Sequence, residues 1–333
     1  MHATRRGFLK AGAAAGALAA APGVLRARDR VALRLGLITP PPDVWTRHAE
    51  IFAAEAAEAS DGRVTVTVFP SAQLGNEAQM LQQVQTGALD MVFITAAELT
   101  NRVDAFNALF APLLVRDDAH AARFLRESET ARGLLDLLPA EIGAVGLAFG
   151  MSGVRQVASR TPIASSGDLA GRKVRITPSA AVRDFSAIIG AAPTPMPLPE
   201  VYSALANGQV DAIEMNLDML LIQRIEEHAP HVLVTNQMLF PMVALVAGRT
   251  WAGLAPADRA MLSELALPRA HAILDEQAAR EAAALGTLRG KAGVTVAVAD
   301  RDFYAEAVAR WEDLWLPRAP TIPRLRAEAA AIS

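Results

Sequence analysis

The chain has 333 residues, of which 52% are hydrophobic and 20% are charged, and its formal net charge is -3. This length favours two domains, and the composition excludes a disordered charged tail. A negative net charge argues against a nucleic-acid partner, because phosphate binding needs a concentrated positive surface. The sequence has no cysteine, which excludes disulfides, thiolate nucleophiles, iron–sulfur clusters and cysteine-ligated zinc.

Residues 1–27 are predicted to be an export signal rather than part of the fold. A basic head at residues 4–10 precedes an alanine- and glycine-rich stretch without acids. This stretch is too short to span a bilayer stably, and the paired Arg5 and Arg6 resemble the twin-arginine signal of proteins exported in folded form. Removal of residues 1–27 takes away four basic residues and no acid, so the net charge becomes -7. We therefore expect a periplasmic protein.

The segment after the export signal has the pattern of an α/β sheet. Residues 31–38 form an apolar run that predicts a strand, and apolar residues recur at helical spacing over 45–59. Valines alternate with polar residues over 64–68, which is typical of a half-buried strand. The order strand, helix, strand predicts the start of a parallel α/β sheet.

A second unit is predicted to begin with a helix that Asn76 caps together with Gln79. Gly87 is expected to end this helix, and the apolar run 89–94 predicts a buried strand. A similar order of helix, glycine, aspartate and strand recurs from Glu200. The repetition hints at two lobes of similar construction.

Three later segments complete the predicted elements. Residues 239–248 are about half as long as a membrane-spanning helix, so we interpret them as a buried strand. Residues 256–285 predict a helix that is interrupted at Pro268. A further helix is predicted through Trp311 and Trp315, whose spacing indicates packing rather than a cofactor site.

The sequence offers no motif for a chemical reaction. Gly150 to Gly153 lacks the residue that a nucleophile elbow needs between its serine and second glycine. Glycine and lysine over 167–173 have the wrong spacing for a phosphate-binding loop. His228 and His231 have no third metal ligand nearby. We therefore expect no enzyme activity, no cofactor and no metal.

Two arginines stand in apolar strand contexts. In a strand, Val174 and Ile176 share one face while Arg175 points to the other, and Arg155 follows Val154. A guanidinium offers two parallel N–H donors that match the two oxygens of a carboxylate. Carboxylate binding is one interpretation, and a solvated or structural role for each arginine is the other.

Seven sequence blocks extend together over essentially the whole chain after the export signal, at 69–77, 87–90, 153–155, 168–175, 190–196, 200–205 and 210–216. In their order and spacing these blocks resemble the periplasmic solute-binding proteins of TRAP (tripartite ATP-independent periplasmic) transporters, of the DctP type. The resemblance implies a type II-like periplasmic binding protein, in which two α/β lobes surround a ligand cleft with a hinge and a long helix. We expect lobe I to comprise residues 31–152 plus 241–285 and lobe II to comprise residues 153–240 plus 286–330.

The resemblance also implies a ligand-binding site. Arg175 would anchor the carboxylate of the ligand, Arg155 would support it, and Glu77 would be an acidic contact at the start of a helix. The other implied ligand-binding positions are Ile38, Thr95, Leu198, Met215 and Asn216.

Some of these positions depart from the family pattern. Asn216 sits next to the usual asparagine contact, whose own place is taken by Met215, and Leu198 stands where an aromatic residue often lines the pocket. Together with Ile38, these residues predict a pocket with apolar walls. We therefore expect a carboxylate with a modest, partly apolar body, such as a short-chain, oxo or aromatic acid, rather than sialic acid or a hexuronate.

The function that the resemblance implies is that of a receptor. A monomeric protein would capture a small organic acid by arginine pairing and lobe closure, then deliver it to the small and large subunits of a membrane permease. Two alternatives stay open at this point: a periplasmic enzyme, and a ligand-binding module that feeds a sensor kinase.

Overall fold

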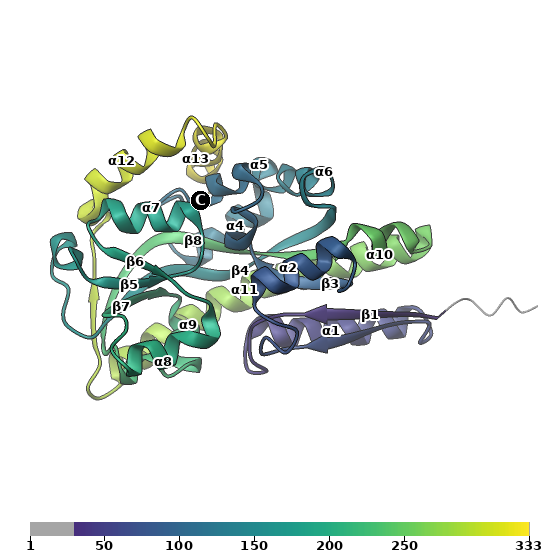
Figure 1. The fold of residues 1–333 in the computed structure, drawn as a ribbon, viewed down its shortest axis with the longest axis horizontal. Coiled ribbons are helices and arrows are strands. Elements are labelled where there is room, and N and C mark those ends of the chain that lie inside the picture. Colours follow the sequence, from purple (N-terminus) through teal and green to yellow (C-terminus); the bar gives the residue numbers. More distant parts are fainter. Residues whose placement is uncertain (1–29, 333) are drawn as a thin grey trace, which may run out of the picture. The chain divides into compact units, whose positions relative to one another are not determined.

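One mixed sheet runs through residues 30–332, the part of the chain that the computed structural model describes (Figure 1). The predicted export signal lies outside these residues. The strands of the described part are β1 (Val31–Gly36), β2 (Val64–Phe69), β3 (Met91–Thr95), β4 (Ala144–Ser159), β5 (Lys173–Ile176), β6 (Ala192–Pro195), β7 (Ala212–Met215), β8 (His231–Ala247) and β9 (Thr295–Val298). Their order is β2-β1-β3-β8-β4-β7-β5-β6, and β9 pairs with β8.

Helices cover both faces of this sheet (Figure 1). The predicted helices at 45–59, at the Asn76 cap and near Trp311 are confirmed. The α-helices of the described residues are α1 (Val44–Ala59), α2 (Glu77–Thr86), α3 (Ala96–Leu99), α4 (Asp118–Glu127), α5 (Glu129–Gly133), α6 (Leu138–Ile142), α7 (Ala180–Ile188), α8 (Val201–Ala206), α9 (Leu217–Ile222), α10 (Gly248–Gly253), α11 (Pro256–Gly290), α12 (Ala305–Trp315) and α13 (Ile322–Ala331).

The parallel sheet predicted from the first strands exists at both ends but not in the centre. β1 pairs in parallel with β2 and β3, and β5 pairs in parallel with β6 and β7. The two long strands β4 and β8 pair with each other in antiparallel fashion, and they also join β7 and β3 in antiparallel fashion. The predicted parallel start of the sheet is therefore confirmed, and in the centre these two antiparallel strands connect one half of the sheet to the other.

The caps predicted for α2 are confirmed. The Asn76 side chain accepts a hydrogen bond from the backbone N–H of Gln79, and the Gln79 side chain accepts one from the backbone N–H of Asn76. Gly87 ends the helix in the left-handed region with φ 74°, where a residue without Cβ is favoured. These caps place the first residue of α2 at Glu77.

Helix α11 is longer and more continuous than the sequence predicted. It extends through Pro268 to Gly290, so the predicted interruption was wrong. A proline removes one backbone donor from a helix, and here ion pairs from residues after Pro268 attach α11 to helices of both halves of the sheet. Arg269 pairs with Glu55 of α1, while Arg280 pairs with Asp218 of α9. One helix therefore spans both halves of the sheet.

The segment at residues 239–248 is a buried strand, as predicted. Nearly all of it belongs to β8, whose side chains are almost entirely buried. Among the described residues, the structure contains no helix with both the length and the apolar character that a membrane crossing requires. The described chain forms one unit from Val31 onward, and the predicted lobe boundaries stay a prediction.

Candidate functional site

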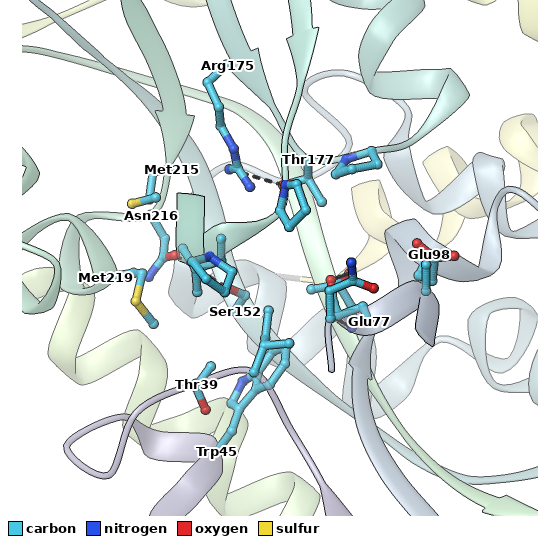
Figure 2. A pocket seen from close by; sticks show the side chains of 18 of the residues that line it. Thr39, Trp45, Glu77, Glu98, Ser152, Arg175, Thr177, Met215, Asn216 and Met219 are labelled. Carbon is cyan, nitrogen blue, oxygen red and sulfur yellow. Dashed lines mark hydrogen bonds between the residues drawn. The ribbon is translucent and has the colours of Figure 1, made fainter. Parts of the chain in front are cut away.

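One pocket of about 110 Å³ collects all the residues that the sequence singled out for ligand binding (Figure 2). Its walls also contain residues that the sequence analysis did not predict. The predicted residues are Ile38, Glu77, Thr95, Arg155, Arg175, Leu198, Met215 and Asn216. The additional residues are Thr39, Trp45, Asn76, Ala78, Glu98, Ser152, Thr177, Pro178, Pro197, Pro199 and Met219.

The pocket forms where strands end. Ile38 follows β1 and Thr95 ends β3 in one half of the sheet, while Thr177 follows β5 and Asn216 follows β7 in the other half. Parallel strands bring their carboxyl ends to one edge of a sheet, and open α/β sheets bind ligands outside that edge. Two groups of strand ends therefore face the same pocket.

Arg175 points into this pocket as the alternation along β5 predicted. Val174 and Ile176 belong to the hydrophobic core, and Arg175 is only 3% exposed. Its guanidinium donates from Nε and Nη2 to the carbonyl oxygen of Met196. Burial lowers the pKa of Arg175 to about 10, so the side chain is charged at neutral pH. Within residues 30–332 this charge has no carboxylate ion-pair partner.

Arg155 is held more completely by the protein itself. Its Nη1 donates to Oδ1 of Asn216 at 2.8 Å, and its Nε lies 3.3 Å from Oε2 of Glu214. The guanidinium carbon lies 3.8 Å from the centroid of the Phe240 ring, a stacking contact that favours a cation. Arg155 is therefore a fixed positive charge in the pocket wall.

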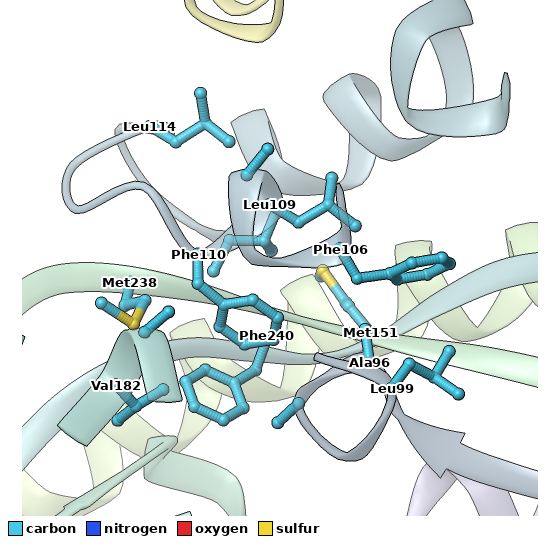
Figure 3. Close-up of a cluster of buried hydrophobic side chains, with 14 of the residues drawn as sticks. Ala96, Leu99, Phe106, Leu109, Phe110, Leu114, Met151, Val182, Met238 and Phe240 are labelled. Carbon is cyan, nitrogen blue, oxygen red and sulfur yellow. The ribbon is translucent and has the colours of Figure 1, made fainter. Parts of the chain in front are cut away.

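Phe240, on which Arg155 stacks, belongs to a cluster of buried apolar side chains. Figure 3 shows this cluster. Phe240 packs edge-on against Phe110 with ring centroids 5.1 Å apart, and Phe106, Met151 and Met238 belong to the same buried core. This apolar cluster excludes water and lowers the local dielectric constant, which strengthens charge interactions in the pocket.

Glu77 and Thr95 form a second polar unit of the pocket. The two carboxylate oxygens of Glu77 accept hydrogen bonds from the backbone N–H and the hydroxyl of Thr95, at 2.6 and 3.0 Å. Burial raises the pKa of Glu77, while these hydrogen bonds and the charges of Arg155 and Arg175 oppose the rise. Since Glu77 opens α2, the Asn76 cap determines where this carboxyl stands.

The amide of Asn216 is engaged by protein groups on both sides. Its Oδ1 accepts from Arg155, and its Nδ2 donates to Oε1 of Glu281 at 2.7 Å. Glu281 also accepts hydrogen bonds from the backbone N–H groups of Leu217 and Asp218 at the start of α9. A chain of contacts thus links α11 to Arg155 through Asn216.

A partly buried carboxyl, Asp118, and a buried one, Glu281, lie close together behind this chain. Burial and the neighbouring charge of Glu281 raise the pKa of Asp118, and burial raises the pKa of Glu281 to about 7. Gly153 stands between them: a Cβ there would lie 3.1 Å from Oδ1 of Asp118 and 3.3 Å from Cδ of Glu281. The close approach of β4, α4 and α11 requires a glycine at this place.

Two of the unpredicted wall residues differ in whether the sequence carried a signal for them. Glu98 is the single charged residue of the run 91–100, which otherwise reads as apolar and threonine-rich. Trp45 donates from Nε1 to the carbonyl oxygen of Met151, 106 positions away. The first could have been noticed as an isolated acid, whereas the second depends on a contact that the sequence does not announce. Within residues 30–332, no group of three or more His, Cys, Asp or Glu side chains could hold a metal ion.

Comparison with known proteins identifies the family. The model of the bacterial extracellular solute-binding proteins, family 7 (DctP), matches residues 35–316. The chain belongs to this family. It is a DctP-type TRAP solute-binding protein with the corresponding two-lobed α/β fold, as the sequence predicted.

Individual relatives agree with this assignment. The C4-dicarboxylate-binding periplasmic protein DctP of Rhodobacter capsulatus is 30% identical over 256 residues, which cover 77% of this chain and 76% of that protein. A TRAP periplasmic solute-binding protein of Xanthobacter autotrophicus Py2, solved with bound β-D-galacturonate, is 28% identical with a TM-score of 0.82, covering 89% of this chain and 99% of the other. A homologue from Polaromonas sp. JS666, bound to D-erythronate, is 27% identical with a TM-score of 0.84 over 91% and 99% of the two chains.

Proposed function

We propose that this receptor captures a small organic acid by pairing the carboxylate of the acid with Arg175. The observation that carries the proposal is the buried guanidinium of Arg175, which has no ion-pair partner within the described residues. A buried charge without a partner is costly, and a ligand carboxylate would supply the partner. Relatives with bound galacturonate and erythronate support this ligand class.

The two arginines would have different roles in this site. No acid among residues 30–332 forms an ion pair with Arg175, whereas Arg155 already faces Glu214 and Asn216. Arg175 would therefore be the anchor and Arg155 the supporting charge. Ile38, Leu198 and Met215 would contact the body of the acid, and Thr95 and Glu77 would contribute polar contacts.

The capture step would be a closure of two lobes, residues 31–152 plus 241–285 and residues 153–240 plus 286–330. The strands β4 and β8 pass between these ranges, and their pairing carries a register shift between Met151 and Gly153, which supports a bending point there. A switch from 1:99 to 99:1 in favour of the closed form needs about 5.5 kcal/mol of differential affinity. Micromolar binding, worth about 8 kcal/mol in total, would suffice.

The remaining parts of the proposal concern the cellular role. The protein would work as a periplasmic monomer exported by a twin-arginine signal, would release the acid chemically unchanged, and would deliver it to the small and large subunits of a TRAP permease. Membership of a family of solute-binding proteins supports transport over the enzyme and sensor alternatives.

The direct test is to identify what the protein binds. Native mass spectrometry of freshly purified protein is expected to show a co-purified small acid. Calorimetric titration with monocarboxylic, dicarboxylic and sugar acids, each beside its neutral amide, should give binding for acids alone. Equal affinity for an acid and its amide, or no binding to any acid, would overturn the proposal.

A further inference from the structure

The pocket has an acidic side that carboxylate binding does not explain. Glu98 of α3 and Glu77 of α2 lie on the side of the pocket opposite Met215, Asn216 and Met219 (Figure 2). Glu77 is partly buried, and Glu98 is buried with only 8% exposed. Two acidic side chains in the wall would repel a ligand carboxylate, so the binding of a simple anion does not account for them.

The two acids differ in what they contact. Glu77 accepts two hydrogen bonds from Thr95, whereas the carboxyl of Glu98 has no hydrogen bond or ion pair within residues 30–332. The charges that act on Glu98 are those of Glu77, which repels it, and Arg102, which attracts it. A buried carboxyl without a donor costs free energy, and the cost grows when a closing cleft removes its water.

We propose that Glu98, beside Glu77, forms a second recognition subsite that takes a hydrogen-bond donor, a hydroxyl or an ammonium group, on the part of the ligand remote from its carboxylate. This inference rests on the proposed capture of an acid by Arg175. The ligand then has two polar ends, with the carboxylate at the arginines and the donor at Glu98.

The other walls of the pocket fit such a molecule. Leu198, Met215 and Met219 line the pocket together with Pro197 and Pro199, so the body of the ligand meets apolar groups. An acid without the distal donor leaves Glu98 unsatisfied in the closed cleft. Sites built to bond an O–H or N–H discriminate strongly against analogues that lack it.

The test compares matched acids. Acids of three to six carbons are titrated by calorimetry in sets of three: the acid with a distal hydroxyl, the acid with a distal ammonium and the unsubstituted acid. In the set that binds best, the wild-type protein should bind a donor-bearing acid at least tenfold more tightly than the unsubstituted acid.

Variants of Glu98 assign that preference to the subsite. Glu98→Ala should bring the affinities of the three acids to within about threefold of one another. Glu98→Gln keeps a carbonyl acceptor but no charge, so it should retain part of a preference for the hydroxyl acid and lose a preference for the ammonium acid. Glu141→Gln, at an exposed position of α6, is the matched control and should bind like the wild type.

The outcomes separate this inference from the proposed function. If acids bind and Arg175→Ala abolishes their binding, but the preference is absent in the wild type or persists in Glu98→Ala, the subsite is refuted and the receptor function stands. If no acid binds the wild type, both fail together. Thermal unfolding of each variant is measured in parallel, so that a loss of fold is not counted as a loss of the subsite.

Discussion

The carbonyl oxygen of Met196 accepts two hydrogen bonds from Arg175, from Nε at 3.0 Å and from Nη2 at 2.6 Å. These bonds engage one edge of the planar guanidinium. The remaining donors include Nη1, whose distance to Oγ1 of Thr177 is 3.5 Å, too long for a strong hydrogen bond. The backbone of the segment after β6 therefore orients Arg175 and leaves its other edge available to a ligand.

Replacement of Arg175 should abolish most of the binding. Arg175→Ala is expected to weaken the binding of a captured acid by about 2–5 kcal/mol, the range for truncation of one partner of a buried charge pair. Arg175→Lys should also weaken it, because an ammonium cannot bond Met196 and a carboxylate with the same planar geometry. Arg183→Ala on α7, where the arginine is exposed and paired with Asp184, should leave calorimetric affinity unchanged. If Arg175→Ala bound the acid with an affinity within twofold of the wild type, Arg175 would not be the anchor of the carboxylate.

The Glu281 carboxyl should stabilise the fold and position Arg155 at the same time. In Glu281→Gln one acceptor oxygen is replaced by a donor, although Leu217, Asp218 and Asn216 all donate to this carboxyl. We expect a loss of about 1–3 kcal/mol in the free energy of unfolding, the cost of buried groups left without partners. Ligand affinity should also fall, because Asn216 would no longer be held against Arg155. Chemical denaturation and calorimetry measure the two effects, and Glu264→Gln, exposed on the same helix, should show neither.

Gly153 should not tolerate a side chain. Its φ is +109°, and a Cβ would lie 3.2 Å from Cβ of Asn216 in addition to its approach to Asp118 and Glu281. Gly153→Ala is therefore expected to destabilise the protein by about 1–3 kcal/mol through backbone strain alone. Gly286→Ala is the matched control: it lies within α11 with no atom near the new Cβ, and should stabilise the protein by about 0.5–1 kcal/mol. Equal unfolding midpoints for the two variants would contradict this account of the packing.

The charge of Glu98 should make stability depend on pH in the ligand-free protein. Burial and, after it, the charge of Glu77 raise the pKa of Glu98 from 4.5 to about 7, while Arg102 opposes the rise. The charged form is therefore disfavoured in the folded state: its penalty is absent below pH 4.5, develops as the pH rises, and is complete above pH 7. Glu98→Gln removes this penalty.

The measurement compares unfolding free energies of the two proteins across pH. The free energy of unfolding of Glu98→Gln, relative to that of the wild type, should rise by about 2–3 kcal/mol between pH 5 and pH 8, at 1.36 kcal/mol for each pKa unit. The free energy of unfolding of Glu141→Gln should change with pH in the same way as that of the wild type over this range. A constant difference between Glu98→Gln and wild type would mean that Glu98 titrates normally.

Local chemistry in the sequence was sufficient for several elements of the fold. The Asn76–Gln79 box, the left-handed Gly87 and the alternation around Arg175 each involve residues within a few positions of one another. For this reason the start of α2, the position of Glu77 and the direction of the Arg175 side chain could be predicted. The pocket location of the predicted ligand-binding residues came from the resemblance to a family, since no local pattern brings Ile38 and Asn216 to the same pocket.

What the sequence by itself determined was where α2 begins and ends and which face of β5 carries the arginine. Only the tertiary structure decided that β4 pairs with β8, that Met196 holds Arg175, and that the Glu98 carboxyl is buried without a partner in the described residues. The physical reason is separation along the chain: caps and alternation act within one turn or one strand, whereas the Trp45–Met151 contact spans 106 positions. Such contacts exist only after the sheet has assembled.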